Sequence, residues 1–287
     1  MTTVTDVARA VAEDRPAPPP RRPSAAGRWI AEHAVILYAG LALFYLFLPV
    51  LVVFAFSFNA PAGRYNFQWN HFSLNAWRNV CGVPGMCEAV SLSLKVALLA
   101  TVVSTIMGTL IAFALVRHRF RGRSSTNLLI FLPMATPEVV MGSSLLALFV
   151  QLQIQPGFTT ILIAHILFCI SFVVITVKAR LQGLDPRLEQ AAMDLYANEW
   201  QTFRRVTLPL VMPGILAAAL LAFSLSFDDF IITNFNSGSR VTFPLFVFGA
   251  NQRGTPPQIN VIGALMFIAA LVLVAVSHIA GRRRAAG

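Results

Sequence analysis

Apolar residues along the 287-residue chain gather into long runs, not into the short alternations of a half-buried sheet. Each run is near the length of about 20 residues that a helix needs to cross a bilayer. Because lipid offers no partner to an open backbone, helices are the expected form. The pattern predicts an all-α polytopic membrane protein with six transmembrane helices, over residues 35–56, 96–116, 128–152, 159–177, 215–233 and 261–279.

The composition agrees with a chain that lies mostly in a bilayer. Hydrophobic residues make up 56% and charged residues 12%, whereas a soluble domain carries about twice that charged fraction. The net charge of +10 would also fit a nucleic-acid-binding protein. The arginines, however, lie in blocks beside the apolar runs, as the positive-inside bias produces, so we exclude nucleic acid as a partner.

The basic blocks also predict the topology. One side receives the residues 117–123, 178–205 and 282–284, together with the N-terminal tail, and the other side is poor in arginine. This asymmetry predicts that both termini are cytoplasmic. Lys95 is then expected at the outer end of the second span. The domains are a disordered cytoplasmic tail over 1–33, a transmembrane domain over 34–281 and a basic cytoplasmic tail over 282–287.

The loop after the first span holds two cysteines, Cys81 and Cys87, and the topology places this loop outside the cytoplasm. In an oxidising compartment, thiols at this separation can close a small disulfide ring. We expect the disulfide, with two free thiols as the alternative.

Catalytic signatures are absent from the sequence. It has no phosphate-binding loop, no metal-ligand spacing and no nucleophile elbow, so the chain is not expected to be an enzyme or to hold a metal. His165 lies deep in a span and is expected to be a hydrogen-bonded packing residue. Uphill transport would need an ion gradient or a partner subunit.

Residues 183–209 carry the densest local signals. Asp185 followed by Pro186 predicts a helix start, and the helix should run to about Leu195. Asn198 with Gln201 three residues later predicts a capping box and a second short helix. That helix should stop before Pro209. The segment is therefore expected to be a compact helix-turn-helix rather than a flexible linker.

The same segment resembles the EAA loop in permease subunits of binding-protein-dependent ABC importers. The resemblance implies a helix that docks onto the partner ATPase and couples it to transport. Two positions depart from the family pattern: Gln190, preceded by Glu189, stands for the leading acid, and Tyr196 stands for the usual glycine. The resemblance assigns coupling to Glu189, Gln190, Ala191, Ala192, Asp194, Tyr196, Leu208 and Pro209.

The wider sequence is similar to the second permease subunit of spermidine/putrescine importers. The resemblance rests on residues 132–142, 168–177, 191–195 and 224–230 and covers residues 34–280. It implies the type I ABC importer permease fold in a bacterial inner membrane. It also implies a second permease, an ATPase dimer holding ATP and Mg, and an external polyamine-binding protein, with no cofactor on this chain.

Three acids inside the apolar runs fit a cationic cargo. Glu138, Asp228 and Asp229 lie where an ionised side chain costs about 2.5–3.5 kcal/mol. Consecutive helical residues are about 100° apart, so one aspartate is expected to line a pathway and the other to meet a neighbouring helix. Phe227 is a further pathway candidate. The alternative is that the acids and the aromatic residue are structural.

Pro133 and Pro137 interrupt the third run, as a kink or as a discontinuous helix beside a transport site. Two other functions stay open. The same architecture could carry ferric iron, thiamine or an aminophosphonate. An ion-gradient carrier or channel would need no ATPase, and the EAA-like loop argues against it.

Overall fold

The structure is a computed structural model that describes residues 25–285, with side chains from 33 to 272. It divides into two units, one up to Val53 and one from Phe54 onward. Most of the expected N-terminal tail, and residues 286–287 of the expected C-terminal tail, lie outside the described residues.

In its described part, from Ala25 onward, the first unit is one helix, α2 (Ala25–Ser57), which continues into the second unit. It begins inside the segment that the sequence assigns to the tail, and its apolar part, His33–Ser57, is long enough to cross a membrane. Large apolar side chains such as Leu37 and Tyr45 are exposed along it. This exposure is what a lipid-facing helix requires.

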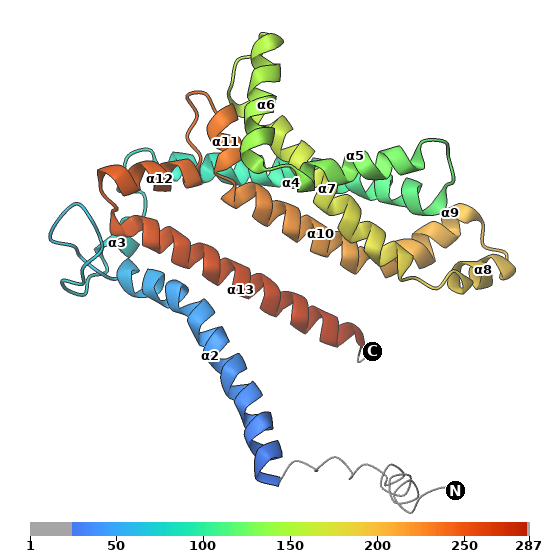
Figure 1. Ribbon diagram of the computed structural model, residues 1–287, viewed down its shortest axis with the longest axis horizontal. Helices are drawn as coiled ribbons and strands as arrows, with labels where there is room; N and C mark the ends of the chain where they lie inside the picture. The colour runs from blue at the N-terminus through green and yellow to red at the C-terminus, as the bar shows by residue number, and fades with distance from the viewer. Residues whose placement is uncertain (1–24, 286–287) are drawn as a thin grey trace, which may run out of the picture. The chain divides into compact units, whose positions relative to one another are not determined.

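The second unit is all helical in its described part (Figure 1). Its elements in chain order are α3 (Asn75–Arg78), α4 (Met86–Arg117), α5 (Arg123–Ala135), α6 (Glu138–Gln151), α7 (Phe158–Gln182), α8 (Arg187–Asp194), α9 (Glu199–Thr202), the π-helix η1 (Phe203–Thr207), α10 (Leu208–Asp228), α11 (Ile231–Asn236), α12 (Phe243–Arg253) and α13 (Pro257–Ala285).

The described helices contain four candidate membrane spans, or five if a sharply bent pair counts as one. The polytopic prediction is therefore confirmed, while the expected number of six exceeds what these helices supply. The difference concerns α13, which is apolar over Pro257–Val272 and whose later side chains lie outside the described residues.

The core of the second unit forms where α4, α7 and α10 pack against one another. Small residues, including Ala112, Ala164 and Ala218, are fully buried there and let the helix backbones approach. Gly108 of α4 shows how close they come: a β-carbon at this position would lie 2.8 Å from Cβ of Val173. The packing holds the ends of the three helices in fixed relation.

The third apolar run is not one continuous helix, which corrects the prediction of a single helix over 128–152. It breaks between α5 and α6, and the helix axis bends by 107° at the break (Figure 1). Pro137 has no N–H for the helical ladder and forces Thr136 into an extended conformation, with φ −82° and ψ 131°. Pro133, by contrast, is accommodated inside α5.

Two helix boundaries also differ from the predictions. α4 begins at Met86, so Lys95 lies inside the helix and not at its end. The helix expected to stop before Pro209 instead continues through η1 into α10. Pro209 occupies the first turn of α10, where a missing N–H costs little, and η1 supplies the change in hydrogen-bond register before it.

Candidate functional site

The 183–209 segment folds as a short helix, a turn and a second short helix, as the sequence predicts. Asp185 Oδ1 accepts a hydrogen bond from Arg187 N at 2.9 Å and so caps the start of α8. The predicted capping box is confirmed: Asn198 Oδ1 accepts from Gln201 N at 2.8 Å, and Gln201 Oε1 accepts from Asn198 N at 3.1 Å. These local bonds keep the segment compact.

The turn after α8 is held in a conformation that usually needs glycine. Tyr196 has φ 63°, and its residue is 98% exposed. The backbone N–H groups of Tyr196 and Ala197 donate to Met193 O at 2.9 Å and Ala192 O at 3.1 Å, which satisfies the last carbonyls of the helix. The tyrosine therefore keeps the turn that the family glycine would make, at a conformational cost.

The two faces of α8 differ sharply in exposure. Glu189 and Ala192, three residues apart, are half-buried and face the rest of the chain. The other residues of α8 are exposed and mix charged, polar and apolar side chains: Arg187, Leu188, Gln190, Ala191, Met193 and Asp194. The exposed Leu195 and Tyr196 follow directly after the helix and extend this outward face. The residues that the sequence assigns to coupling thus divide into an inner and an outer set.

Glu189 is bonded within the chain. Its Oε1 accepts the Arg117 guanidinium at the end of α4 and the Thr207 hydroxyl, at 2.6 Å, at the end of η1. Leu208 and Pro209 follow Thr207 directly as the first residues of α10. Sequence reasoning missed Arg117 and Thr207, because a contact across 72 residues leaves no local signal.

At its other end, α10 stops at Asp228, five residues before the predicted end of the run at 233. Asp229 takes an extended backbone, with φ −62° and ψ 124°, and its carboxylate turns to the following helix. Asp229 Oδ2 accepts from Thr233 N and from Thr233 Oγ1, each at 2.7 Å. This capping of α11 by a side chain competes with continuation of α10 and explains the break.

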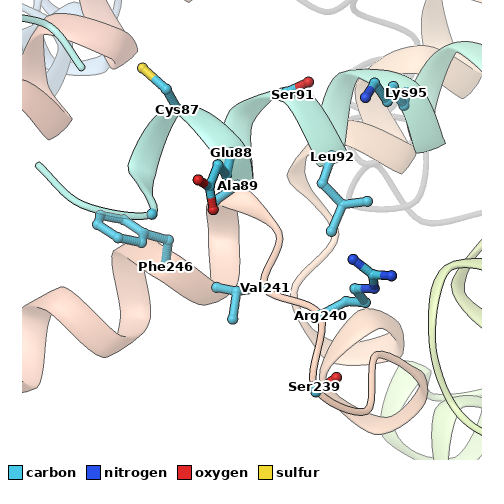
Figure 2. A pocket seen from close by; sticks show the side chains of 11 residues that line it. Cys87, Glu88, Ala89, Ser91, Leu92, Lys95, Ser239, Arg240, Val241 and Phe246 are labelled. Atoms are coloured by element: carbon cyan, nitrogen blue, oxygen red, sulfur yellow. The ribbon is translucent and has the colours of Figure 1, made fainter.

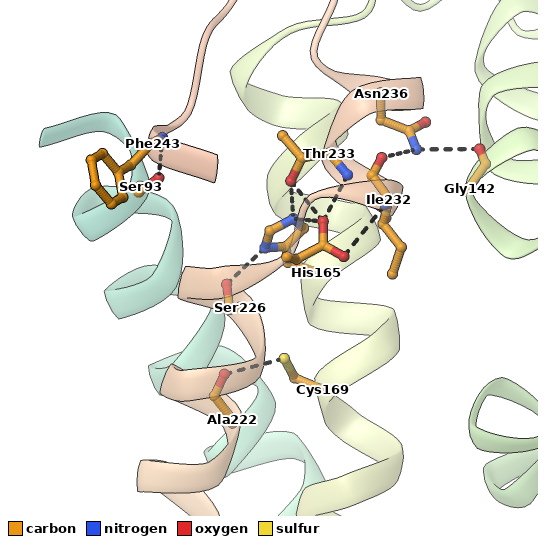
Figure 3. A network of polar contacts seen from close by, with 11 residues as sticks. Ser93, Gly142, His165, Cys169, Ala222, Ser226, Ile232, Thr233, Asn236 and Phe243 are labelled. Atoms are coloured by element: carbon orange, nitrogen blue, oxygen red, sulfur yellow. Dashed lines mark hydrogen bonds and ion pairs between the residues drawn. The ribbon is translucent and has the colours of Figure 1, made fainter. Parts of the chain in front are cut away.

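Asp229 also belongs to a buried polar network, which Figure 3 shows around His165. His165 Nδ1 lies 2.7 Å from Ser226 Oγ, and its Nε2 lies 2.9 Å from Thr233 Oγ1 and 3.3 Å from Asp229 Oδ2. The network joins α7, α10 and α11. The expectation that His165 is a hydrogen-bonded packing residue is confirmed.

Hydrogen bonds in the same region connect α6 and α11, the helices that follow the two breaks. Asn236 Nδ2 donates to Gly142 O at 3.3 Å (Figure 3). Thr160 Oγ1, on α7, donates to Asn236 O at 2.7 Å. A β-carbon on Gly142 would lie 3.3 Å from Cα of Ile232, so α6 and α11 pack closely. The polar residues inside the apolar runs are the signal from which sequence reasoning could have found this network.

Asp228 and Glu138 lie at the two helix breaks, and both are exposed. Asp228 is the last residue of α10, and Glu138 is the first residue of α6. Phe227 is half-buried in an aromatic cluster, with its ring centroid 6.0 Å from Phe223 and 6.3 Å from Phe243. Asp228 and Glu138 are thus exposed, whereas Asp229, the chain neighbour of Asp228, is buried.

The N-terminal end of α4 carries a separate cavity. Cys81 and Cys87 form a disulfide there, with their Cα atoms 5.5 Å apart. Figure 2 shows Glu88 and Arg240 among the residues that line the cavity. A neighbouring cavity shares Val241 and Phe246 with it. Of the expected site residues, Cys87 alone is among those that line these two cavities.

Comparison with known proteins identifies the family. Residues 100–283 match the model of the binding-protein-dependent transport system inner membrane component. The chain belongs to this family. It is therefore a multi-pass inner-membrane subunit of an ABC transport system, and it is not itself the catalytic component. A binding protein, an ATPase and a partner permease are implied by family membership.

Curated members of the family resemble the chain over most of their length. The spermidine/putrescine transport system permease protein PotC of Haemophilus influenzae is 36% identical over 240 residues, which cover 83% of this chain and 93% of that protein. The putrescine transport system permease protein PotI of Escherichia coli K12 is 38% identical over 240 residues, covering 81% of this chain and 84% of that protein.

Solved structures support the fold. A chain of a bacterial ABC transporter that imports the polysaccharide alginate matches with a TM-score of 0.61 and 18% identity, covering 90% of this chain and 98% of that chain. A chain of an amino acid ABC transporter matches with a TM-score of 0.57 and 20% identity, covering 74% of this chain and 100% of that chain. The permease fold is thereby shown.

Proposed function

We propose that this chain is the permease subunit of an ATP-driven importer for polyamines, with spermidine and putrescine as the expected cargo. The observation that carries the proposal is the 36–38% identity to PotC and PotI across at least 81% of the chain. The match extends over most of the chain and is not confined to the segment that resembles an ATPase-docking loop.

The exposed acids at the helix breaks support a cationic cargo. Asp228 and Glu138 present negative charge where two helices are interrupted, and polyamines are flexible multivalent cations. We propose that these two acids line the pathway and that Asp229 holds the shape of the break through Thr233 and His165. Phe227 is then a wall of the pathway, backed by other aromatic rings.

The outward face of α8 supports the docking of a partner ATPase. Its exposed apolar side chains, including Leu188, Met193 and Tyr196, form a surface that a partner would cover. Gln190, Ala191 and Asp194 lie on the same face. The remaining coupling residues, Glu189, Ala192, Leu208 and Pro209, would then act by holding this face against the transmembrane helices.

We propose that the chain crosses the membrane six times, with α13 as the last span and both termini in the cytoplasm. The tail over 1–33 and the basic end over 282–287 are cytoplasmic. The assembly adds a second permease, an extracytoplasmic polyamine-binding protein and an ATPase dimer that holds ATP and Mg. The arginine blocks beside the apolar runs support this orientation.

Uptake of labelled spermidine and putrescine by a strain that lacks this chain tests the proposal. We expect uptake to be lost and to return when the chain is supplied. Normal uptake in the deletion strain would contradict a polyamine cargo. Loss of ferric iron, thiamine or aminophosphonate uptake instead would identify another cargo on the same architecture. We expect a partner ATPase to co-purify with the chain.

A further inference from the structure

One carboxylate oxygen joins three elements at the start of α10. Oε1 of Glu189, on α8, accepts the guanidinium of Arg117, the last residue of α4, and the hydroxyl of Thr207, the last residue of η1. The sequence separations are 72 and 18 residues. Local folding of the 183–209 segment does not require such a convergence, since its caps already hold α8 and α9.

The surroundings make this contact stronger than an exposed ion pair. Thr207 is 4% exposed and the Glu189 side chain 20% exposed, so water screens the charge only in part. Next to it, the rings of Phe113 on α4 and Phe203 on η1 meet edge to face, with centroids 5.4 Å apart. This aromatic contact holds α4 and η1 together beside Glu189, which bonds to both.

The hydrogen bonds of α8 set Glu189 apart from the other described residues of this helix. Among the described residues, the other hydrogen bonds found for α8 stay within residues 183–209. Glu189 thus connects α8 to α4 by a polar contact and, through Thr207, to the first turn of α10. α10 then runs without a break to Asp228 while packing against α4. A displacement of α8 reaches both long helices at this point.

We propose that Glu189 is a positioning residue that transmits movement of α8 to α4 and α10. The inference rests on the proposed docking of an ATPase onto the outward face of α8. It gives Glu189 a different task from its neighbours on that face. They meet the partner, whereas Glu189 converts the position of α8 into the position of the two helices that lead away from the 183–209 segment.

Three substitutions separate the parts of the contact. Glu189→Gln removes the charge for Arg117 but can still accept from Thr207. Thr207→Val removes the hydroxyl at constant shape, and Arg117→Gln removes the other partner. The matched control is Glu199→Gln. Glu199 lines the same cavity as Glu189, and within the described chain its side chain has no hydrogen bond or ion pair assigned.

The first readout is the ratio of labelled-spermidine uptake to ATP hydrolysed, measured in proteoliposomes and normalised to assembled complex. We expect the ratio to fall about fivefold or more in Glu189→Gln, less in Thr207→Val, and not at all in Glu199→Gln. The exchanged pair Arg117→Glu with Glu189→Arg should recover at least part of the loss. A purely structural role would lower the amount of complex and leave the ratio unchanged.

The second readout does not depend on the cargo. Spin labels at Arg187→Cys, at the start of α8 and outside the assigned coupling residues, and at Met212→Cys on α10 report the distance between the two helices. The native cysteines do not interfere, since Cys81 and Cys87 are paired and Cys169 is buried. We expect one narrow distance in the assembled complex and a broad distribution after Glu189→Gln. An unchanged narrow distance, or an unchanged ratio where the native complex transports spermidine, would overturn the proposal. Absence of spermidine uptake by the native complex would instead contradict the cargo.

Discussion

The two ends of α10 use acidic residues in related but unequal ways. At its start, Glu189 turns inward from α8 to Arg117 and Thr207, while the neighbouring residues of α8 face outward. At its end, Asp229 turns inward to Thr233 and His165, while Asp228 is exposed. In each place, adjacent positions on the chain have opposite environments.

The difference between the two ends lies in burial. Asp229 is 8% exposed and is satisfied by hydroxyl and backbone groups of α11 and by the imidazole of His165 on α7. Glu189 is only half-buried and spans elements that touch at their ends. A buried, fully bonded acid fixes one arrangement, whereas a half-buried acid at a junction can move with it. The first suits a fixed helix break and the second a moving connection.

Replacing Asp229 with alanine tests the fixed end and should give the largest effect. The change leaves the backbone N–H of Thr233 buried without its partner and removes one of the polar contacts of His165, which keeps Ser226 and the Thr233 hydroxyl. We expect a loss of about 3 kcal/mol in stability and little assembled complex. The measurement is the yield and thermal unfolding of the purified complex. Normal yield with a selective loss of uptake would assign Asp229 to the pathway.

Replacing Asp228 with asparagine tests the exposed acid beside it. Asparagine keeps the size and the hydrogen-bonding capacity of the side chain, so the charge is the variable. We expect normal assembly and a fall of about fivefold in polyamine uptake, which corresponds to about 1 kcal/mol of attraction for a cation. Asp228→Glu is the control and should retain most uptake. Equal uptake in Asp228→Asn and the native protein would make this acid structural.

Paired substitutions at Ala191 and Ala192 test the two faces of α8. Ala191 is exposed, so aspartate there should weaken ATPase binding about tenfold while the permease stays folded. Ala192 shares the inner face with Glu189, so aspartate there adds a like charge beside it and should disturb the permease itself. Affinity for the ATPase and thermal stability of the permease distinguish the two. The same phenotype from both would contradict the division of faces.

Much of the fold follows from the apolar runs. The run over 159–177 lies inside α7, and the capping box at Asn198 marks the start of α9. The runs cannot reveal where a helix bends, because apolar composition records contact with lipid or core and not the path of the backbone. The break at Pro137 had a signal in its proline, and the end of α10 had one in Asp229, three residues before Ile232.

The site follows from the sequence only in part. Helix geometry predicts that Asp228 and Asp229 point in different directions, but tertiary packing decides which of them is buried. The EAA-like pattern locates the 183–209 segment without showing that Glu189 faces inward. Contacts such as Arg117 with Glu189 join distant parts of the chain and need a structure to be seen.

The smallest effect should come from replacing Tyr196 with glycine, which separates conformation from contact in the 183–209 segment. At φ 63°, a side chain lowers the stability of the fold by about 1–2 kcal/mol. Glycine avoids this strain, but it raises the conformational entropy of the unfolded chain, which lowers stability by about 0.4–1 kcal/mol. We therefore expect a net gain of about 0.5 kcal/mol in stability, seen as a small rise in Tm. Tyr196→Ala keeps the conformational strain and removes the ring, so it should show no such gain. If both variants weaken ATPase binding equally, the exposed ring contacts the partner. If Tyr196→Ala stabilises the protein as much as Tyr196→Gly, release of backbone strain at this turn does not explain the gain in stability.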